Sequence, residues 1–205
     1  MWIKICGLTS PEAVNAALEL KVDALGFVFA ESPRRLSVSQ AAQLAQSAHG
    51  RAQRVAVTRH PTQAAVDEIV ELFKPDVLQS DAADLQRLRL PASLERLAVV
   101  RDVAGEMLNL PARILFEGAL SGSGVASDWQ LARQLSRRTQ LILAGGLDRD
   151  NVGAAIARVR PFGVDVSSGV EERPGLKSAA RMQQFVEAVR AAARAAAQTG
   201  TEDFS

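Results

Sequence analysis

Short runs of apolar, often β-branched residues alternate along the whole chain with longer segments whose apolar residues recur at helical spacing. The short runs predict strands over Trp2–Cys6, Ala24–Phe29, Arg54–Thr58, Val77–Gln79, Leu97–Arg101, Arg113–Glu117, Gln140–Ala144 and Gly163–Val166. The longer segments predict helices over Pro11–Leu20, Ser39–Ala48, Thr62–Phe73, Ala83–Arg89, Asp128–Ser136, Arg149–Val159 and Ser178–Ala197. The strands are continuous apolar runs, as is typical of parallel strands that are buried on both faces.

Strands and helices that alternate in units of about 25 residues predict an α/β protein with a single (β/α)8 TIM barrel over residues 1–205. The segment Ala104–Leu110 is too short and too interrupted for a helix, so we expect a short or irregular connection after strand five. We expect residues 198–205, which follow the last helix, to be frayed.

Composition and charge exclude several classes of protein. The chain has 24 Lys+Arg and 23 Asp+Glu without a long basic stretch, which argues against nucleic acid as a partner. Its start lacks a signal-peptide pattern, and no apolar run approaches the ~18 residues of a membrane span, so we expect a cytoplasmic protein without a membrane partner. One cysteine and two histidines, His49 and His60, give no metal-site spacing.

In a barrel of this kind, chemistry takes place at the carboxyl ends of the strands, where two candidate groups lie. Cys6 ends the first strand and is the only cysteine. A free cysteine is most often an inert core residue, but this position allows a reactive thiol. Because side chains alternate along a strand, Lys4 lies on the same face as Cys6 and is the nearest residue that could activate it. Glu117 ends the sixth strand and is a candidate general acid, although a rim carboxylate paired with a cation is the alternative.

Other charged residues flank the strands. Arg34 or Arg35, after the second strand, could hold a carboxylate, and each alternatively is a solvated loop residue. Asp165 lies inside the eighth strand, where it must be paired or hydrogen-bonded, so we expect it to line the pocket or anchor a loop. Asp23 and Asp76 precede strands and are expected to serve stability at the opposite face.

Glycine-bearing turns follow strands six, seven and eight. They contain Gly124 after strand six, Gly145 and Gly146 after strand seven, and Ser167, Ser168 and Gly169 after strand eight. In such barrels, loops after strands seven and eight often form a phosphate site, because glycines let backbone N–H groups approach the oxygens. The sequence therefore predicts a small phosphorylated substrate.

Several of these stretches together resemble the phosphoribosylanthranilate isomerase family of tryptophan biosynthesis. The matching stretches are Lys4–Thr9, Asp23–Phe29, Ser32–Arg34, Gly122–Gly124, Asp128–Trp129, Leu143–Leu147, Val164–Glu171 and Pro174–Lys177. The resemblance spans the chain and implies a (β/α)8 barrel that needs no cofactor and no metal and catalyses an Amadori rearrangement of N-(5-phosphoribosyl)anthranilate. We expect a monomer or a homodimer.

The resemblance also implies roles for individual residues. Cys6 matches the general base, Arg34 the group that holds the anthranilate carboxylate, and Glu117 the position of the family's general acid, which is usually an aspartate. The backbone around Gly124, Gly146, Ser168 and Gly169 matches the phosphate cradle.

The ends of strands three, four and five depart from the family's usual sequence patterns. The chain has Thr58-Arg59-His60 after strand three and Gln79-Ser80-Asp81 at strand four, and it lacks the usual Lys-Ala after strand five. A related phosphosugar isomerase or epimerase, and a non-catalytic barrel that binds a phosphorylated metabolite, therefore stay as alternatives.

Overall fold

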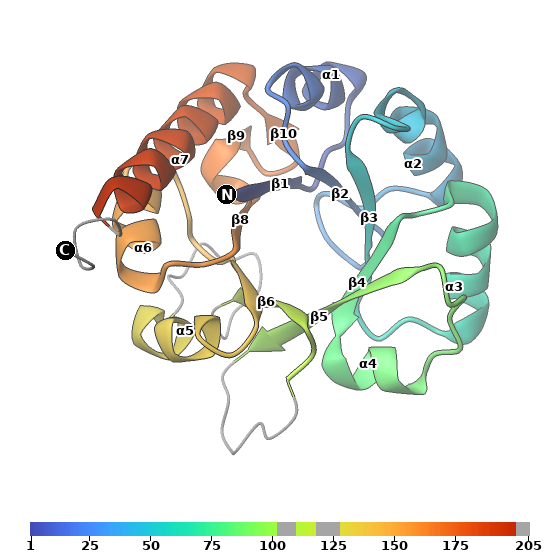
Figure 1. The fold of residues 1–205 in the computed structure, drawn as a ribbon. Coiled ribbons are helices and arrows are strands. Elements are labelled where there is room, and N and C mark those ends of the chain that lie inside the picture. Colours follow the sequence, from blue (N-terminus) through green and yellow to red (C-terminus); the bar gives the residue numbers. More distant parts are fainter. Residues whose placement is uncertain (102–109, 118–127, 200–205) are drawn as a thin grey trace.

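The computed structural model describes residues 1–101, 110–117 and 128–199 (Figure 1). Within them, eight parallel strands close into a barrel in the order of the sequence, so the predicted (β/α)8 fold is confirmed. The strands are β1 (Trp2–Cys6), β2 (Ala24–Val28), β3 (Gln53–Val57), β4 (Val77–Asp81), β5 (Glu95–Arg101), β6 (Arg113–Glu117), β7 (Gln140–Leu143) and β8 (Gly163–Val166).

Helices surround the strands, as the (β/α) alternation requires (Figure 1). They are α1 (Pro11–Glu19), α2 (Val38–Leu44), α3 (Gln63–Glu68), α4 (Ala82–Arg87), α5 (Trp129–Ser136), α6 (Val152–Val159) and α7 (Ala179–Thr199). Several begin at a side chain that caps the first turn: Ser10, Ser37, Thr62 and Asp128 each accept a hydrogen bond from a backbone N–H two or three residues later. No helix in the described ranges is both long enough and apolar enough to cross a membrane.

Two predicted helices continue in a different winding. The predicted helix Ser39–Ala48 is α2 followed by a 3₁₀ turn, η1 (Ala45–Ala48), and the predicted helix Thr62–Phe73 is α3 followed by a π turn, η2 (Ile69–Phe73). The π turn ends at Lys74, which has a left-handed backbone and donates its N–H to the Ile69 carbonyl. The apolar spacing over one turn is compatible with an α-helix, a 3₁₀ turn or a π turn, so the sequence pattern could not distinguish the three.

The sequence pattern missed the elements between β8 and α7. After β8 comes a 3₁₀ turn, η3 (Ser168–Val170), and then an antiparallel hairpin of β9 (Glu171–Arg173) and β10 (Leu176–Lys177). These strands are too short and too polar to form an apolar run. The hairpin lies on the side of the barrel where β1 and β8 meet (Figure 1).

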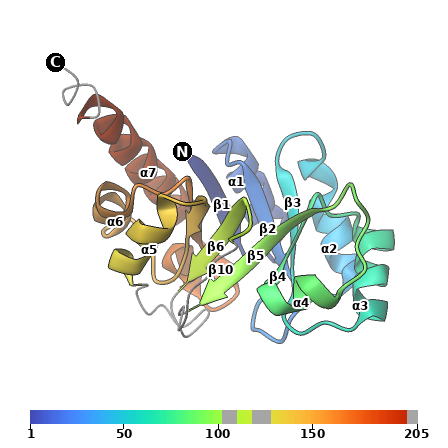
Figure 2. The same cartoon turned by 60° about the horizontal axis from the view of Figure 1, so that its bottom comes forward.

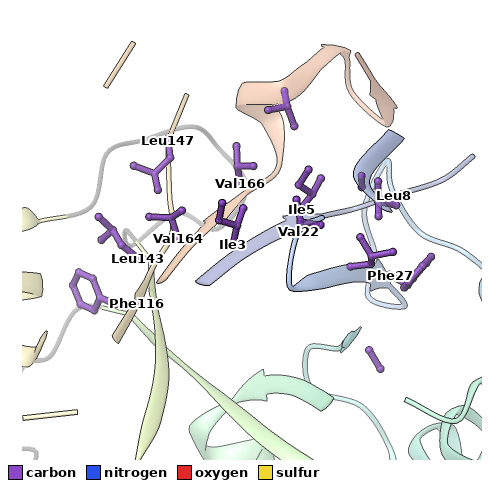
Figure 3. Close-up of a cluster of buried hydrophobic side chains, with 14 of the residues drawn as sticks. Ile3, Ile5, Leu8, Val22, Phe27, Phe116, Leu143, Leu147, Val164 and Val166 are labelled. Atoms are coloured by element: carbon purple, nitrogen blue, oxygen red, sulfur yellow. The ribbon is translucent and has the colours of Figure 1, made fainter. Parts of the chain in front are cut away.

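Alternation along the strands divides the core into two layers. The inner layer consists of small or branched side chains inside the barrel: Ala24, Val55, Val77, Leu97, Val99, Leu115, Ile142 and Ala144. The outer layer packs the strands against the helices, and Figure 3 shows Ile3 and Ile5 of β1 beside Val164 and Val166 of β8. The odd-numbered inner residues of β5 and β6 continue to Arg101 and Glu117, which places these two groups at the barrel mouth.

The two ends of the barrel are used differently. In Figure 2 the N-terminus lies at the end opposite the arrowhead of β5. At that amino end, Asp23 accepts a hydrogen bond from Ile3 N at 2.8 Å and Asp76 pairs with Arg54, so the predicted stabilising roles are confirmed. Gln198 and Thr199 belong to α7, and residues 200–205 lie outside the described residues. Of the expected irregular connection Ala104–Leu110, all but Leu110 lies outside them as well.

Candidate active site

The strand ends surround a pocket of about 380 Å³ at the carboxyl end of the barrel. Eight of the residues predicted for the site line it: Cys6, Arg34, Glu117, Asp165, Gly145, Gly146, Ser167 and Ser168. Gly169 follows Ser168 in the η3 turn, and Gly124 lies outside the described residues. Arg35 is exposed, so the choice that the sequence left open between the two arginines falls on Arg34.

A buried ion pair forms the floor below Cys6. Lys4 Nζ donates to Asp165 Oδ1 at 2.8 Å, and the Lys4 side chain is fully buried. The two residues are register partners on β1 and β8, so barrel closure itself brings them together. This confirms the predictions that Asp165 would be paired and that Lys4 would face the same side as Cys6.

The thiol of Cys6 lies in a low-dielectric environment with a nearby cation. Burial raises the pKa of Cys6 above its ordinary value, an effect that the Lys4 ammonium opposes through its charge and a hydrogen bond. The Asp165 carboxylate reinforces the rise, while Lys177 opposes it. Burial and the Asp165 carboxylate together outweigh the two lysines, so the net direction of the Cys6 pKa shift is upward.

Arg34 is tightly held. Its Nε and Nη2 each donate to one oxygen of the Glu171 carboxylate, at 2.7 Å. The same carboxylate accepts a hydrogen bond from Lys177 Nζ at 2.7 Å. Burial would favour the neutral acid, but the hydrogen bonds from Arg34 and Lys177 lower the pKa of Glu171, so this carboxylate stays ionised.

Glu117 belongs to a second charged group across the pocket. Arg101, its register partner on β5, donates to Glu117 Oε1 from Nε at 2.7 Å, and Nη2 lies 2.6 Å from the same oxygen. Arg101 Nη1 contacts Asp81 Oδ1 at the end of β4. The rim pairing that the sequence left as an alternative is therefore present, and three positions at the ends of β4, β5 and β6 form one network.

The loops after β7 and β8 approach each other closely. Gly145 and Gly146 both have positive φ, at 90° and 64°, and Asn151 Nδ2 donates to the Gly146 carbonyl at 2.7 Å. A Cβ atom on Gly169 would lie 2.0 Å from the Leu147 carbonyl oxygen, so only glycine allows this contact. The backbone of the loop after β8 therefore packs directly against the backbone of the loop after β7.

Sequence reasoning gave no role to Arg101, Asp81, Glu171 and Lys177. Arg101 and Asp81 end strands, so the rule that selected Cys6 and Glu117 also applies to them. Glu171 and Lys177 lie in the missed hairpin, and only their charges within the phosphate-loop stretch could have pointed to them.

Two other features of the described residues were considered as sites. A larger cleft, of about 780 Å³, lies at the amino end beside Asp23 and Asp76, whose carboxylates already bind backbone N–H groups. His60, Asp81 and Asp84 place potential metal ligands within 4.8 Å of one another. Their carboxylates already accept hydrogen bonds from cations and hydroxyl or backbone donors, which explains the grouping without a metal.

Comparisons with known proteins agree with this geometry. The family model described as N-(5'phosphoribosyl)anthranilate (PRA) isomerase matches residues 3–188. An N-(5'-phosphoribosyl)anthranilate isomerase of Allorhizobium ampelinum is 38% identical over 219 residues, which cover 97% of each chain.

Solved structures give the same result. The crystal structure of TrpF from Jonesia denitrificans has a TM-score of 0.79 and 32% identity, covering 94% of this chain and 98% of that chain. A phosphoribosyl anthranilate isomerase in complex with reduced 1-(o-carboxyphenylamino)-1-deoxyribulose 5-phosphate has a TM-score of 0.74 and 25% identity, covering 93% and 99%. The chain therefore belongs to the N-(5'-phosphoribosyl)anthranilate isomerase family, the isomerases of tryptophan biosynthesis.

Proposed function

We propose that the chain isomerises N-(5'-phosphoribosyl)anthranilate with Cys6 as general base and Glu117 as general acid. One observation carries this assignment: both groups line the same pocket, together with an arginine and the two glycine loops. In the closed barrel, β1 and β6 are separated by β7 and β8 on one side and by β2 to β5 on the other. An acid and a base on these two strands face a substrate from different sides.

The reaction needs one proton donor and one proton acceptor. Glu117 protonates the ribose ring oxygen, the C1′–O4′ bond breaks, and its electron pair stays on the oxygen while the anilino nitrogen lone pair forms an iminium. The Cys6 thiolate then removes the C2′ proton, and the C–H electron pair forms the enolamine double bond as the iminium electrons return to nitrogen. Protonation at C1′ and loss of the enol proton give the ketone.

The remaining residues bind the two ends of the substrate. We propose that Arg34 holds the anthranilate carboxylate, because a guanidinium matches a carboxylate in shape and charge. The phosphate occupies the surface formed by Gly145, Gly146 and residues 167–169, where backbone N–H groups favour an anion. Gly124 belongs to the same proposed cradle, and Asp165, paired with Lys4, lines the pocket beside it.

The proposal also covers the assembly and the cellular location of the protein. The enzyme acts as a monomer or as a homodimer, and sedimentation velocity distinguishes the two. A phosphorylated metabolite as substrate fits a cytoplasmic enzyme, which fractionation of the source cells tests.

Purified protein tests the assignment directly. It should consume the fluorescent substrate, and Cys6→Ala and Glu117→Ala should each abolish turnover while the proteins stay folded. Arg34→Ala should raise KM for the substrate, whereas the exposed neighbour Arg35→Ala should leave KM unchanged. Full activity in both catalytic variants, or failure to restore growth of a tryptophan auxotroph lacking this isomerase, contradicts the proposal.

A further inference from the structure

The Arg34 guanidinium is fixed before any substrate is present. Two of its three nitrogens, Nε and Nη2, are bound to Glu171, which leaves the Nη1 edge for another partner. The side chains of Arg34 and Glu171 are only 11% and 3% exposed. A planar guanidinium group that binds a buried carboxylate through one edge can present its other edge to a ligand in only one orientation.

Glu171 is itself anchored to the other end of the pocket. Lys177 Nζ donates to Glu171 Oε1 at 2.7 Å and to the Ser167 carbonyl at 3.0 Å. Ser167 Oγ in turn donates to the Cys6 carbonyl at 3.0 Å. A continuous series of hydrogen bonds therefore joins Arg34 to the start of the phosphate loop and to the end of β1.

The hairpin of β9 and β10 supports this series. Glu171 and Lys177 are register partners on its two strands, so their contact follows from the pairing of the hairpin. Thr9 Oγ1 donates to the Gly175 carbonyl in the hairpin turn at 2.6 Å, which ties the hairpin to the loop after β1. The hairpin thus holds Glu171 in place relative to the barrel.

The charges of this cluster leave an attractive site for an anion. A pair of Arg34 and Glu171 alone would be neutral, but Lys177 adds a second cation to the one carboxylate. With all three groups ionised, the cluster carries one excess positive charge next to the phosphate loop. The carboxylate of Glu171 therefore orients Arg34 without making this side of the pocket repel a substrate carboxylate.

We infer that Glu171, anchored by Lys177 on the β9–β10 hairpin, is the positioning residue that holds Arg34 in the orientation that receives the substrate carboxylate. The inference rests on the proposed function, in which Arg34 binds that carboxylate. Glu171 does not touch the substrate in this arrangement. Because it already holds the long Arg34 side chain in place, that side chain loses no conformational freedom when the substrate binds. The ordering of one rotamer-rich side chain is worth about tenfold in affinity.

Two matched inhibitors test the inference through binding. The first is reduced 1-(o-carboxyphenylamino)-1-deoxyribulose 5-phosphate, and the second is the same molecule without its carboxyl group. Glu171→Gln should weaken the first inhibitor about tenfold and leave the second within about twofold, because only the first uses the oriented Arg34. Glu172→Gln, which changes the exposed next residue of the hairpin, is the control and should alter neither affinity.

Further variants separate positioning from a structural role. Lys177→Met keeps the bond between Arg34 and Glu171 but removes its anchor, so it should weaken the first inhibitor selectively and by a smaller factor; it also serves as the test if Glu171→Gln does not fold. In an Arg34→Ala background, Glu171→Gln should cause no further selective loss. Equal weakening of both inhibitors, or no weakening of either, overturns the inference.

The binding assay also distinguishes this inference from the proposed function. If Glu171→Gln selectively weakens the inhibitor that carries the carboxyl group but the wild-type protein does not turn over the substrate, the catalytic assignment fails while the positioning role of Glu171 stands. If the wild-type protein turns over the substrate and Glu171→Gln shows no selective loss, the positioning role fails alone.

Discussion

Replacing Lys4 with methionine tests how much of the barrel's stability depends on the ion pair below the active site. Lys4 is completely buried, and its ammonium lies 2.8 Å from Asp165 Oδ1. Methionine has a similar length and fills most of the same space, so the main change is the loss of the charge. The Asp165 carboxylate then remains in the barrel without its cation.

The size of the effect follows from the geometry. At 2.8 Å and an effective dielectric constant of about 20, two unit charges attract by about 6 kcal/mol, which offsets the cost of removing both from water. Breaking such a buried pair by removing one partner typically costs about 3–5 kcal/mol. Since whole domains are stable by about 5–15 kcal/mol, Lys4→Met should remove a large share of the free energy of unfolding.

Urea unfolding followed by circular dichroism measures this loss. With an m-value of about 2–3 kcal/mol/M, the midpoint should fall by about 1–2.5 M. The Asp165 carboxylate and Cys6 raise the pKa of Lys4 even though burial acts in the opposite direction. The stabilisation is therefore fully present below the unfolded pKa of about 10.4 and is lost as the pH rises through the higher folded pKa. The difference between the two proteins should stay constant from about pH 6 to 9.

A double variant and a surface control make the test decisive. Lys4→Met combined with Asp165→Val removes both charges and should recover a substantial part of the lost stability, because no buried carboxylate is left unpaired. Arg158→Met, at an exposed position on α6, should change stability by less than about 0.5 kcal/mol. A Lys4→Met protein within about 1 kcal/mol of wild type, or a double variant no more stable than the single one, refutes the reasoning.

Other predictions concern the pocket. Because burial raises the pKa of Cys6 and only the thiolate reacts with iodoacetamide, the rate at which iodoacetamide alkylates Cys6 should keep rising with pH beyond about 8.5, the ordinary thiol value; a plateau below that pH contradicts this. A Cβ atom on Gly26 would lie 2.8 Å from Cys6 Sγ, so Gly26→Ala should displace the thiol and lower kcat about a hundredfold. Gly153→Ala, in open space on α6, is the control and should leave kcat unchanged. Equal rates in the two variants refute this. Gly169→Ala should abolish competitive inhibition by inorganic phosphate, because its Cβ clashes with the Leu147 carbonyl; an unchanged inhibition constant argues against the proposed cradle.

The barrel and much of its mouth could be predicted because they depend on local pattern. The barrel strands are four to seven residues long, and each contains a short apolar run. The polar or glycine-bearing residues that follow such a run indicate where the strand stops, which is where a barrel of this kind places its functional groups. A carboxylate buried inside β8 is costly unless it has a partner, so the pairing of Asp165 could be predicted. Lys4 on the same face as Cys6 followed from the two-residue period of a strand.

Pairing between distant side chains could not be predicted in the same way. That Arg101 binds both Asp81 and Glu117 depends on the stagger of three neighbouring strands, which no local pattern records. The bond between Arg34 and Glu171 depends on the hairpin Glu171–Lys177, whose two short strands have no apolar period. The direction of the Cys6 pKa shift is a balance of burial against several charges, and only coordinates give the distances on which that balance depends.

The meeting of β1 and β8 has a consequence for the order in which the enzyme becomes active during synthesis. Lys4 pairs with Asp165, Ser167 with the Cys6 carbonyl, and Thr9 with Gly175, so the surroundings of Cys6, the proposed base, depend on partners more than 160 residues later. Contacts of such long sequence separation form late in folding, because the loop that they close is entropically costly. A ribosome-bound chain that has not yet released β8 and the hairpin carries a cysteine without its electrostatic environment. Catalytic competence should therefore appear abruptly, with barrel closure, and not grow strand by strand.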